Sequence, residues 1–242
     1  MKPFSRATTR TLQIGAMMLS ATVLAACGGG GTSPLGTVSG TAAVGAAMAN
    51  ASIQLTCKNG AGSATANASG AYSVSFQFDG PCAITASNGA ATIHSFASGA
   101  GTYNVTPLTQ LLLSYLAGQL GTTVDGLLSG IASNASYQSA LTNPSVIQNA
   151  EAGVAQLIKK MYGVTLSTSS FLMVSFTPGQ SGADSDLDTL LTVGAISSNG
   201  QPSTSLAAAA VSAGEASPIS GSGNTGPTGG TGGTGGAGTT TK

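Results

Sequence analysis

Three aspartates, Asp184, Asp186 and Asp188, alternate along the chain with the spacing that calcium-binding loops use for their first carboxylate ligands. Such a loop also needs a glycine for its turn and a closing glutamate that binds the ion with both oxygens. Thr189 and Ala195 occupy those two positions here. The pattern therefore supplies candidate ligands without completing a calcium loop, and we expect no bound metal or cofactor.

The same acidic segment has a simpler interpretation as the start of a short helix. Carboxylates are favoured in the first turn of a helix, where backbone amides and the helix dipole stabilise negative charge. Asp184 or Ser185 would cap this helix, which would continue through Leu187, Leu190 and Leu191. A further hypothesis makes the aspartates the acid and base of a cell-envelope polymer hydrolase. The chain has few acidic residues and no tryptophan on which a sugar could stack, which weakens that hypothesis.

His94 is the only histidine of the chain. A catalytic triad or a histidine-based metal site would need partner side chains that the sequence does not identify. We therefore interpret His94 as an ordinary strand residue. The sequence also lacks a G-x-S-x-G elbow, an H-E-x-x-H pair, a phosphate-binding glycine loop and a dinucleotide fingerprint. We predict no catalytic residue and expect that the protein is not an enzyme.

The N-terminal segment carries three positive charges, at Lys2, Arg6 and Arg10, followed by an apolar stretch that ends in Leu24-Ala25-Ala26-Cys27. The stretch is too short to cross the roughly 30 Å hydrocarbon core of a bilayer. Residues 1–26 resemble the signal peptide of bacterial lipoproteins. The resemblance implies that Cys27 receives a diacylglyceryl group and becomes the acylated N-terminus of the mature protein.

This resemblance places the protein in the bacterial cell envelope, anchored in a membrane by its lipid. Gly28 rather than Asp follows the cysteine, which in Gram-negative lipoproteins implies sorting to the outer membrane. The alternative is an ordinary cleaved signal that ends near Ala26. Without residues 1–26, four lysines stand against seven acidic residues, a formal charge of about −3, so nucleic acid is not expected as a partner. Because only 6% of the chain is charged, neutral polar and small residues must cover its surface.

Lipidation of Cys27 would leave Cys57 and Cys82 as a natural disulfide pair in an oxidising envelope. Residues 53–57 and 82–86 both alternate between apolar and polar, which puts each cysteine on the apolar face of a strand. A bridge that closes this loop contributes about 3 kcal/mol in the chain-entropy model. A metal site is the alternative, but the two cysteines lack the C-x-x-C spacing and have one histidine to join them.

Residues 27–36 are rich in glycine and predict a flexible tether. Residues 37–106 contain short alternating runs broken by Gly and Asn, which indicate a small antiparallel β domain. Its clearest strand is 71–78, where one face carries Tyr72, Val74, Phe76 and Phe78.

Two motifs of this region are similar to those of carboxypeptidase regulatory-like, or transthyretin-like, β-sandwich modules. Gly40-Thr41 with Ala49-Asn50-Ala51-Ser52-Ile53-Gln54-Leu55 resembles their opening motif, and Asn67-Ala68-Ser69-Gly70-Ala71-Tyr72 resembles their turn into a strand. Asn67 replaces the usual Asp and Asn50 replaces the usual Gly. The resemblance implies a β-sandwich over 37–106 that serves as a rigid spacer or a binding platform.

From Pro107 onward the apolar period becomes helical, and residues 107–200 are expected to form a small helical unit. The best-defined helix covers 144–162, because Asn143 suits the N-cap, Pro144 suits the first turn and Gly163 suits the end. A second segment, 124–132, is expected to pack with it. Residues 201–242 predict a low-complexity tail rich in Gly, Thr and Ala, of which 221–242 should be disordered.

The predicted fold class is therefore α+β, a small antiparallel β-sandwich followed by a small α-helical unit, with disordered termini. The leading functional hypothesis is a lipid-anchored envelope protein that acts as a non-catalytic structural or protein-interaction module. Its partners would be the membrane, through the lipid, and another envelope protein or a glycan. The alternatives are a carbohydrate-binding lipoprotein, for which Tyr103 or Tyr137 should be exposed, and the polymer hydrolase considered above.

Overall fold

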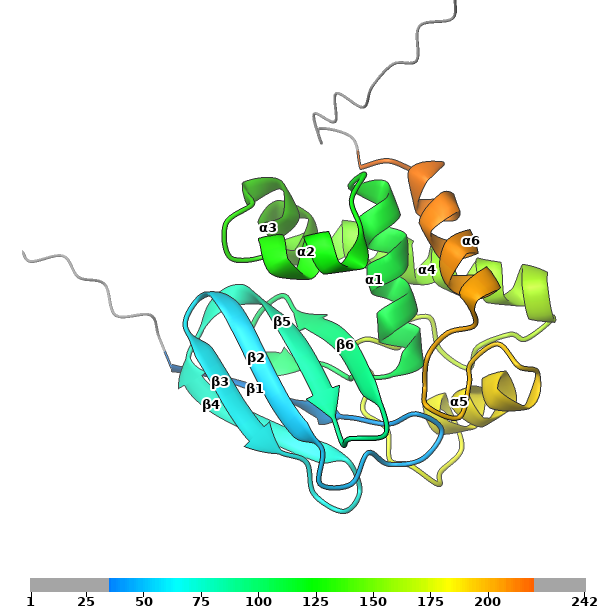
Figure 1. The fold of residues 1–242 in the computed structure, drawn as a ribbon, viewed down its shortest axis with the longest axis horizontal. Helices are drawn as coiled ribbons and strands as arrows, with labels where there is room; N and C mark the ends of the chain where they lie inside the picture. Colours follow the sequence, from blue (N-terminus) through cyan, green and yellow to red (C-terminus); the bar gives the residue numbers. More distant parts are fainter. Residues whose placement is uncertain (1–34, 220–242) are drawn as a thin grey trace, which may run out of the picture. The chain divides into compact units, whose positions relative to one another are not determined.

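The structure is a computed structural model that describes residues 35–219. The predicted signal sequence 1–26, the predicted lipidation site Cys27, nearly all of the predicted tether and the segment beyond Ile219 lie outside the described residues. The predictions made for these segments stay predictions. Residues 35–219 combine two β-sheets with six α-helices, which agrees with the mixed class predicted from sequence (Figure 1).

Residues 35–102 form a three-stranded sheet in the order β4-β1-β7 and a four-stranded sheet in the order β3-β2-β5-β6. The expectation of an entirely antiparallel module is wrong at one pair: β1 and β7 are parallel, because the chain returns after β6 to lie alongside its own first strand. The other pairs are antiparallel. The strands are β1 (Leu35–Thr41), β2 (Ser52–Asn59), β3 (Ala61–Thr65), β4 (Ala71–Gln77), β5 (Asp79–Ser87), β6 (Thr92–Ala97) and β7 (Gly101–Thr102).

Apolar side chains from both sheets meet in one continuous core. Val38 and Val74 come from the three-stranded sheet, and Ile53 and Ile84 come from the four-stranded sheet. The sheets also approach each other at Gly62 of β3, where an added Cβ would lie 2.7 Å from the Val74 side chain of β4. The alternation that predicts β4 is confirmed, because every second side chain of its first four residues is buried.

Six helices follow the strands, and α4 begins and ends where the sequence predicts. Asn143 accepts hydrogen bonds from the backbone amides of Ser145 at 3.0 Å and Val146 at 3.3 Å, and Gly163 ends the helix with a φ of 71°. The helices are α1 (Pro107–Gln119), α2 (Val124–Gly130), α3 (Ala135–Thr142), α4 (Pro144–Tyr162), α5 (Ala183–Thr192) and α6 (Thr204–Glu215). Of these, α3 and α6 have no counterpart in the prediction.

Helix α6 corrects the prediction that a low-complexity tail starts at residue 201. Ser203 caps it, and its inner face buries Leu206 and Ala210. In Figure 1 α6 runs beside α1, and the two helices touch at Gly118 and Gly214. A Cβ at either glycine would lie 2.1 Å from a backbone oxygen of the other helix. An alanine-rich segment forms a helix readily, and this close packing gives it a partner to bury against.

Side chains of α1 bind the outer edge of strand β6. The backbone amide of His94 donates to Gln110 Oε1 at 2.8 Å, and Thr109 Oγ1 donates to the His94 carbonyl at 3.2 Å. Gln201 extends this contact, because its side-chain nitrogen donates to the Thr92 carbonyl at 2.7 Å. These bonds satisfy backbone groups that an edge strand would otherwise leave unpaired. They also join the four-stranded sheet to the helices.

Candidate functional site

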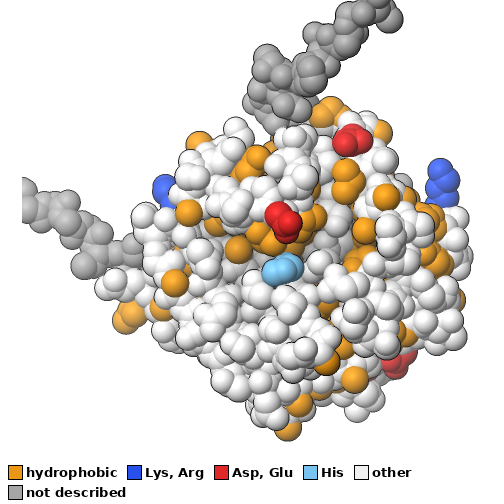
Figure 2. All heavy atoms as spheres, in the orientation of Figure 1, with side chains coloured by type: hydrophobic (Ala, Val, Ile, Leu, Met, Phe, Trp, Pro, Cys, Tyr) orange, Lys and Arg blue, Asp and Glu red, His pale blue; other side chains and the backbone are white. Residues whose placement is uncertain are grey.

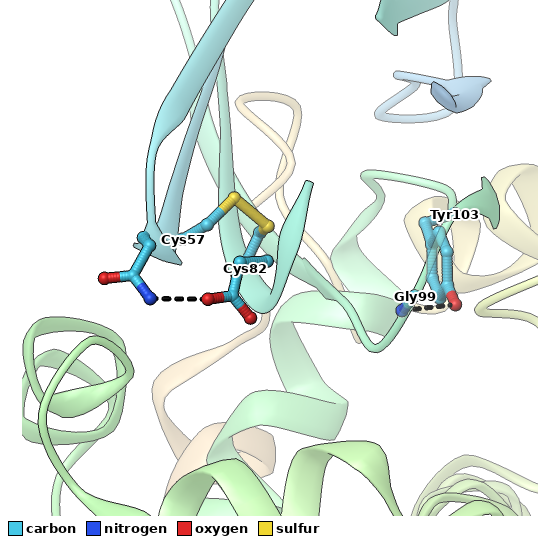
Figure 3. The surroundings of a disulfide bond; sticks show 6 residues. Cys57, Cys82, Gly99 and Tyr103 are labelled. Carbon is cyan, nitrogen blue, oxygen red and sulfur yellow. Dashed lines mark hydrogen bonds between the residues drawn. A yellow bond between two sulfur atoms is a disulfide. The ribbon is translucent and has the colours of Figure 1, made fainter. Parts of the chain in front are cut away.

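The disulfide expected between Cys57 and Cys82 is present in the structure (Figure 3). The two residues are paired directly across β2 and β5, with their Cα atoms 3.9 Å apart. Both cysteines are buried, at 3% and 0% exposure. Because the bridge joins the two central strands of the four-stranded sheet and is closed to solvent, it acts as a structural element of the β module.

The three aspartates of the acidic segment point to different partners. Asp184 accepts a hydrogen bond from the Gly179 amide at 2.7 Å, and Asp186 accepts two bonds from Ser167, from its amide at 2.9 Å and from its hydroxyl at 2.7 Å. Asp184 and Asp186 are buried, whereas Asp188 is exposed. The first two carboxylates therefore stabilise the long connection between α4 and α5.

Neither the calcium interpretation nor the predicted cap gains support from this arrangement. Within residues 35–219 no three His, Cys, Asp or Glu side chains come together in a group that could hold a metal ion. The helix of the second interpretation exists as α5, but Asp184 and Ser185 lie inside its first turn and do not cap it. Gly182 is the N-cap, and its amide donates to Ser185 Oγ at 3.1 Å. Gly182 has a φ of 107°, a backbone conformation that glycine adopts easily, and this allows the chain to turn into α5.

His94 lies on β6 as an ordinary strand residue, which agrees with its interpretation from sequence. Its Nδ1 is 3.0 Å from Thr85 Oγ1, the residue directly opposite on β5. Partial burial lowers the pKa of His94 below its usual value, and the Asp125 carboxylate opposes this shift. The contact between His94 and Thr85 is an ordinary one between polar side chains that lie opposite each other on adjacent strands.

Glu151 is a buried carboxyl group that sequence reasoning missed. It lies on α4 with 4% exposure, and its Oε1 accepts a hydrogen bond from the Leu172 amide at 2.8 Å. Burial raises the pKa of Glu151 to about 7, although this hydrogen bond favours the charged form. The only signal in the sequence is an acidic residue within the otherwise apolar face of a helix. Its position shows a role in fixing the segment that follows α4.

Asn104 is a second buried polar residue that holds the same segment. It has no exposed surface, and its side-chain nitrogen donates to the carbonyls of Phe171 at 3.1 Å and Val174 at 2.7 Å. Its side-chain oxygen accepts from the Thr41 amide at 3.2 Å. Asn104 therefore ties the end of β1 to residues 171–174. These bonds explain why an amide side chain is tolerated in the core.

The tyrosines named as candidate sugar-stacking residues do not form an exposed platform. Tyr103 is buried at 2% exposure, and its hydroxyl is bonded to Ser98 at 2.8 Å. The same hydroxyl accepts from the Gly99 amide at 3.0 Å (Figure 3). Tyr137 is half-buried, and its ring packs over Gly130, where an added Cβ would lie 2.7 Å away. The expectation of an exposed tyrosine is therefore wrong for Tyr103, and Tyr137 is only partly exposed.

A different tyrosine, Tyr115, lines a groove of about 650 Å³ between α1, α4 and residues 217–219. On α4 the wall is a stripe of residues spaced three to four apart, with Ala152 and Gly153 at its centre and longer amide side chains on either side. The small central residues leave the hollow open. The lining residues are Tyr115, Gln119, Asn143, Val146, Asn149, Ala152, Gly153, Gln156, Ser217, Pro218 and Ile219.

The groove presents hydrogen-bonding groups without partners of their own. Tyr115 is 7% exposed, its ring rests on Gly153, and its hydroxyl makes no hydrogen bond within the described part of the chain. Gln119 donates to the Ser217 carbonyl at 2.8 Å, but its Oε1 is buried and has no partner among residues 35–219. Asn149 and Gln156 are exposed on the α4 wall. Sequence patterns do not reveal this site, because its three walls are far apart in the chain.

The lining of the groove is also uncharged. None of the lining residues is Lys, Arg, His, Asp or Glu. Figure 2 shows one face of the molecule, where charged side chains are few and isolated among hydrophobic and other uncharged groups. No helix within residues 35–219 is long and apolar enough to cross a membrane. The chemistry offered by the groove is hydrogen bonding to a neutral ligand.

Comparison with known proteins gives no family assignment: no family model, no curated protein and no solved structure matches the chain.

Proposed function

We propose that the protein is a lipid-anchored protein of the bacterial cell envelope that acts as a non-catalytic binding module. Cys27 would carry the lipid and hold the protein at the outer membrane. The support for this anchor is the sequence Leu24-Ala25-Ala26-Cys27 behind a positively charged, apolar leader. The two sheets with a shared core are consistent with the sandwich of carboxypeptidase regulatory-like modules. In this proposal the sandwich is a rigid platform and the helices provide the binding surface.

The observation that carries the proposal is the groove between α1 and α4. Its unpaired amide and hydroxyl groups can bind a ligand by hydrogen bonds, and its lining contains no carboxyl, imidazole or ammonium group that could move a proton in a reaction. The hydrolase alternative has no comparable support, because the two buried aspartates of α5 are bonded to Gly179 and Ser167.

Membrane fractionation of cells that express the protein tests the anchor. Cys27→Ser should move the protein from the membrane fraction to the soluble fraction and abolish incorporation of labelled palmitate. The matched control is the double variant Cys57→Ser with Cys82→Ser, which removes the disulfide but leaves Cys27 for lipidation. If Cys27→Ser stays in the membrane fraction, the proposed anchor is wrong.

Site-specific crosslinking tests the binding role in intact cells. A photoreactive amino acid is placed at Gln156, which lines the groove, or at Gln148, which is exposed on α4 but does not line it. We expect Gln156 to yield one recurrent envelope component, a protein or a glycan, that Gln148 does not capture. Equal capture at both positions, or capture at neither, would refute the groove as a binding surface.

A further inference from the structure

We infer that the groove between α1 and α4 binds a neutral oligosaccharide. This inference rests on the proposed binding function and names the class of ligand. The groove volume of about 650 Å³ lies within the range of small-molecule sites. Its polar groups are amides and hydroxyls, which can each donate and accept hydrogen bonds, as the hydroxyl groups of a sugar do. The absence of charge in the lining of the groove favours a neutral ligand.

Two residues that line the groove carry polar atoms without a partner among residues 35–219. A buried polar group without a hydrogen bond is costly, and native proteins rarely leave one unexplained. Gln119 Oε1 is such a group within residues 35–219, and Gln119 lines the groove. Tyr115 lines the same groove, and its hydroxyl has no hydrogen-bond partner within residues 35–219. A ligand hydroxyl in the groove can bind the Tyr115 hydroxyl, which can both donate and accept a hydrogen bond.

The walls of the groove disfavour a peptide as the occupant. Peptides commonly bind by adding a strand to a sheet edge or by laying an apolar helix face in an apolar groove. The two long walls here are α1 and α4, whose backbone groups are bonded inside the helices. On the α4 wall the amides Asn149 and Gln156 flank the small residues Ala152 and Gly153, so no continuous apolar stripe forms. These two amides are seven residues apart, which is about 10 Å along a helix. That length suits an extended oligosaccharide better than a single small molecule.

Calorimetric titration of the full mature protein tests the inference. The probes are neutral hexasaccharides of N-acetylglucosamine, of glucose and of galactose, each titrated to millimolar concentration. At least one should bind to the unmodified protein. Asn149→Ala and Gln156→Ala should each weaken that binding about five-fold, the usual effect of one net hydrogen bond. Gln148→Ala removes an amide of similar exposure outside the groove and should bind like the unmodified protein.

Tyr115→Phe provides a second variant that keeps the packing. It removes only the hydroxyl, which has no partner within the described residues, so the thermal midpoint should stay unchanged while binding weakens several-fold. The inference is overturned if none of the hexasaccharides binds, or if all groove variants bind like the unmodified protein. Capture of a protein through Gln156 together with a failed titration would reject the oligosaccharide and leave the proposed binding function intact.

Discussion

The contact between α1 and α6 predicts that Gly214→Ala destabilises the protein. In an exposed helix, replacing glycine by alanine stabilises by about 0.5–1 kcal/mol, because alanine has the better helix propensity. At Gly214 the new Cβ would lie 2.1 Å from the Tyr115 carbonyl oxygen and 2.9 Å from the Gln119 nitrogen, both on the backbone of α1. A Cβ atom essentially never comes closer than 3.0 Å to another heavy atom. The helices must therefore separate locally by about 1 Å.

The expected magnitude follows from two opposing effects. Overpacking of this kind costs about 1–3 kcal/mol, and the gain in helix propensity offsets part of it. We expect a net loss of about 1–2 kcal/mol in the free energy of unfolding. For a domain of this size that lowers the thermal midpoint by about 2–8 °C. Gly118→Ala should have a similar effect, because its Cβ would lie 2.1 Å from the Val211 carbonyl oxygen.

Thermal unfolding followed by circular dichroism measures the effect, with the disulfide intact in all samples. Ser212→Ala is the matched control, because Ser212 lies on the same helix but is exposed to solvent. Its midpoint should be unchanged or slightly raised. If Gly214→Ala raises the midpoint as the control does, α6 does not pack against α1 at this glycine and the reasoning is refuted.

Three further predictions concern the buried polar residues and the disulfide. Asn104→Leu should cost about 3–5 kcal/mol in urea unfolding, because three backbone groups lose their partner; a cost below about 1 kcal/mol would contradict this role. The pKa of Glu151 is raised from its usual value of 4.5 to about 7 in the folded protein, so the folded state holds this proton to a higher pH than the unfolded chain does. The free energy of unfolding should therefore fall by about 3 kcal/mol as pH rises from 4.5 to about 7 and then level off. Glu151→Gln keeps the acceptor for Leu172 and should remove this dependence, which the difference between the two stability curves against pH shows. Replacing Cys57 and Cys82 by alanine should cost about 3 kcal/mol, and a reducing agent should then have no further effect on the thermal midpoint.

Local signals predicted part of this fold well. The bounds of α4 could be read from Asn143, Pro144 and Gly163, because capping depends on residues within one turn of the helix. The alternation of β4 followed from the period of two in a strand. The pairing of Cys57 with Cys82 followed from the cysteine count, because lipidation of Cys27 would leave these two, and the strand period placed both on apolar faces. These features need no knowledge of distant contacts.

The features that sequence reasoning missed depend on packing between distant segments. The two faces of helix α6 differ little in polarity, so its sequence resembles a low-complexity alanine-rich tail. Its contact with α1 is what identifies it as a packed helix. The exposure of Tyr103 could not be read from the sequence, because the groups that bury and bind it come from the surrounding fold. The aspartates of α5 looked like a ligand set until their partners, Gly179 and Ser167, were known.

Tyr115 is the point at which helix packing and the groove can be separated experimentally. Its carbonyl oxygen faces Gly214 of α6, whereas its ring and hydroxyl rest on Gly153 of α4. A Cβ at Gly153 would lie 2.6 Å from the ring and 2.7 Å from the hydroxyl oxygen. Alanine at Gly153 therefore displaces a side chain that lines the groove, whereas alanine at Gly214 displaces a helix backbone. If the groove binds a ligand through this hydroxyl, Gly153→Ala should reduce affinity by at least as much as Tyr115→Phe does. An unchanged affinity for Gly153→Ala would mean that the position of the Tyr115 ring does not matter for binding.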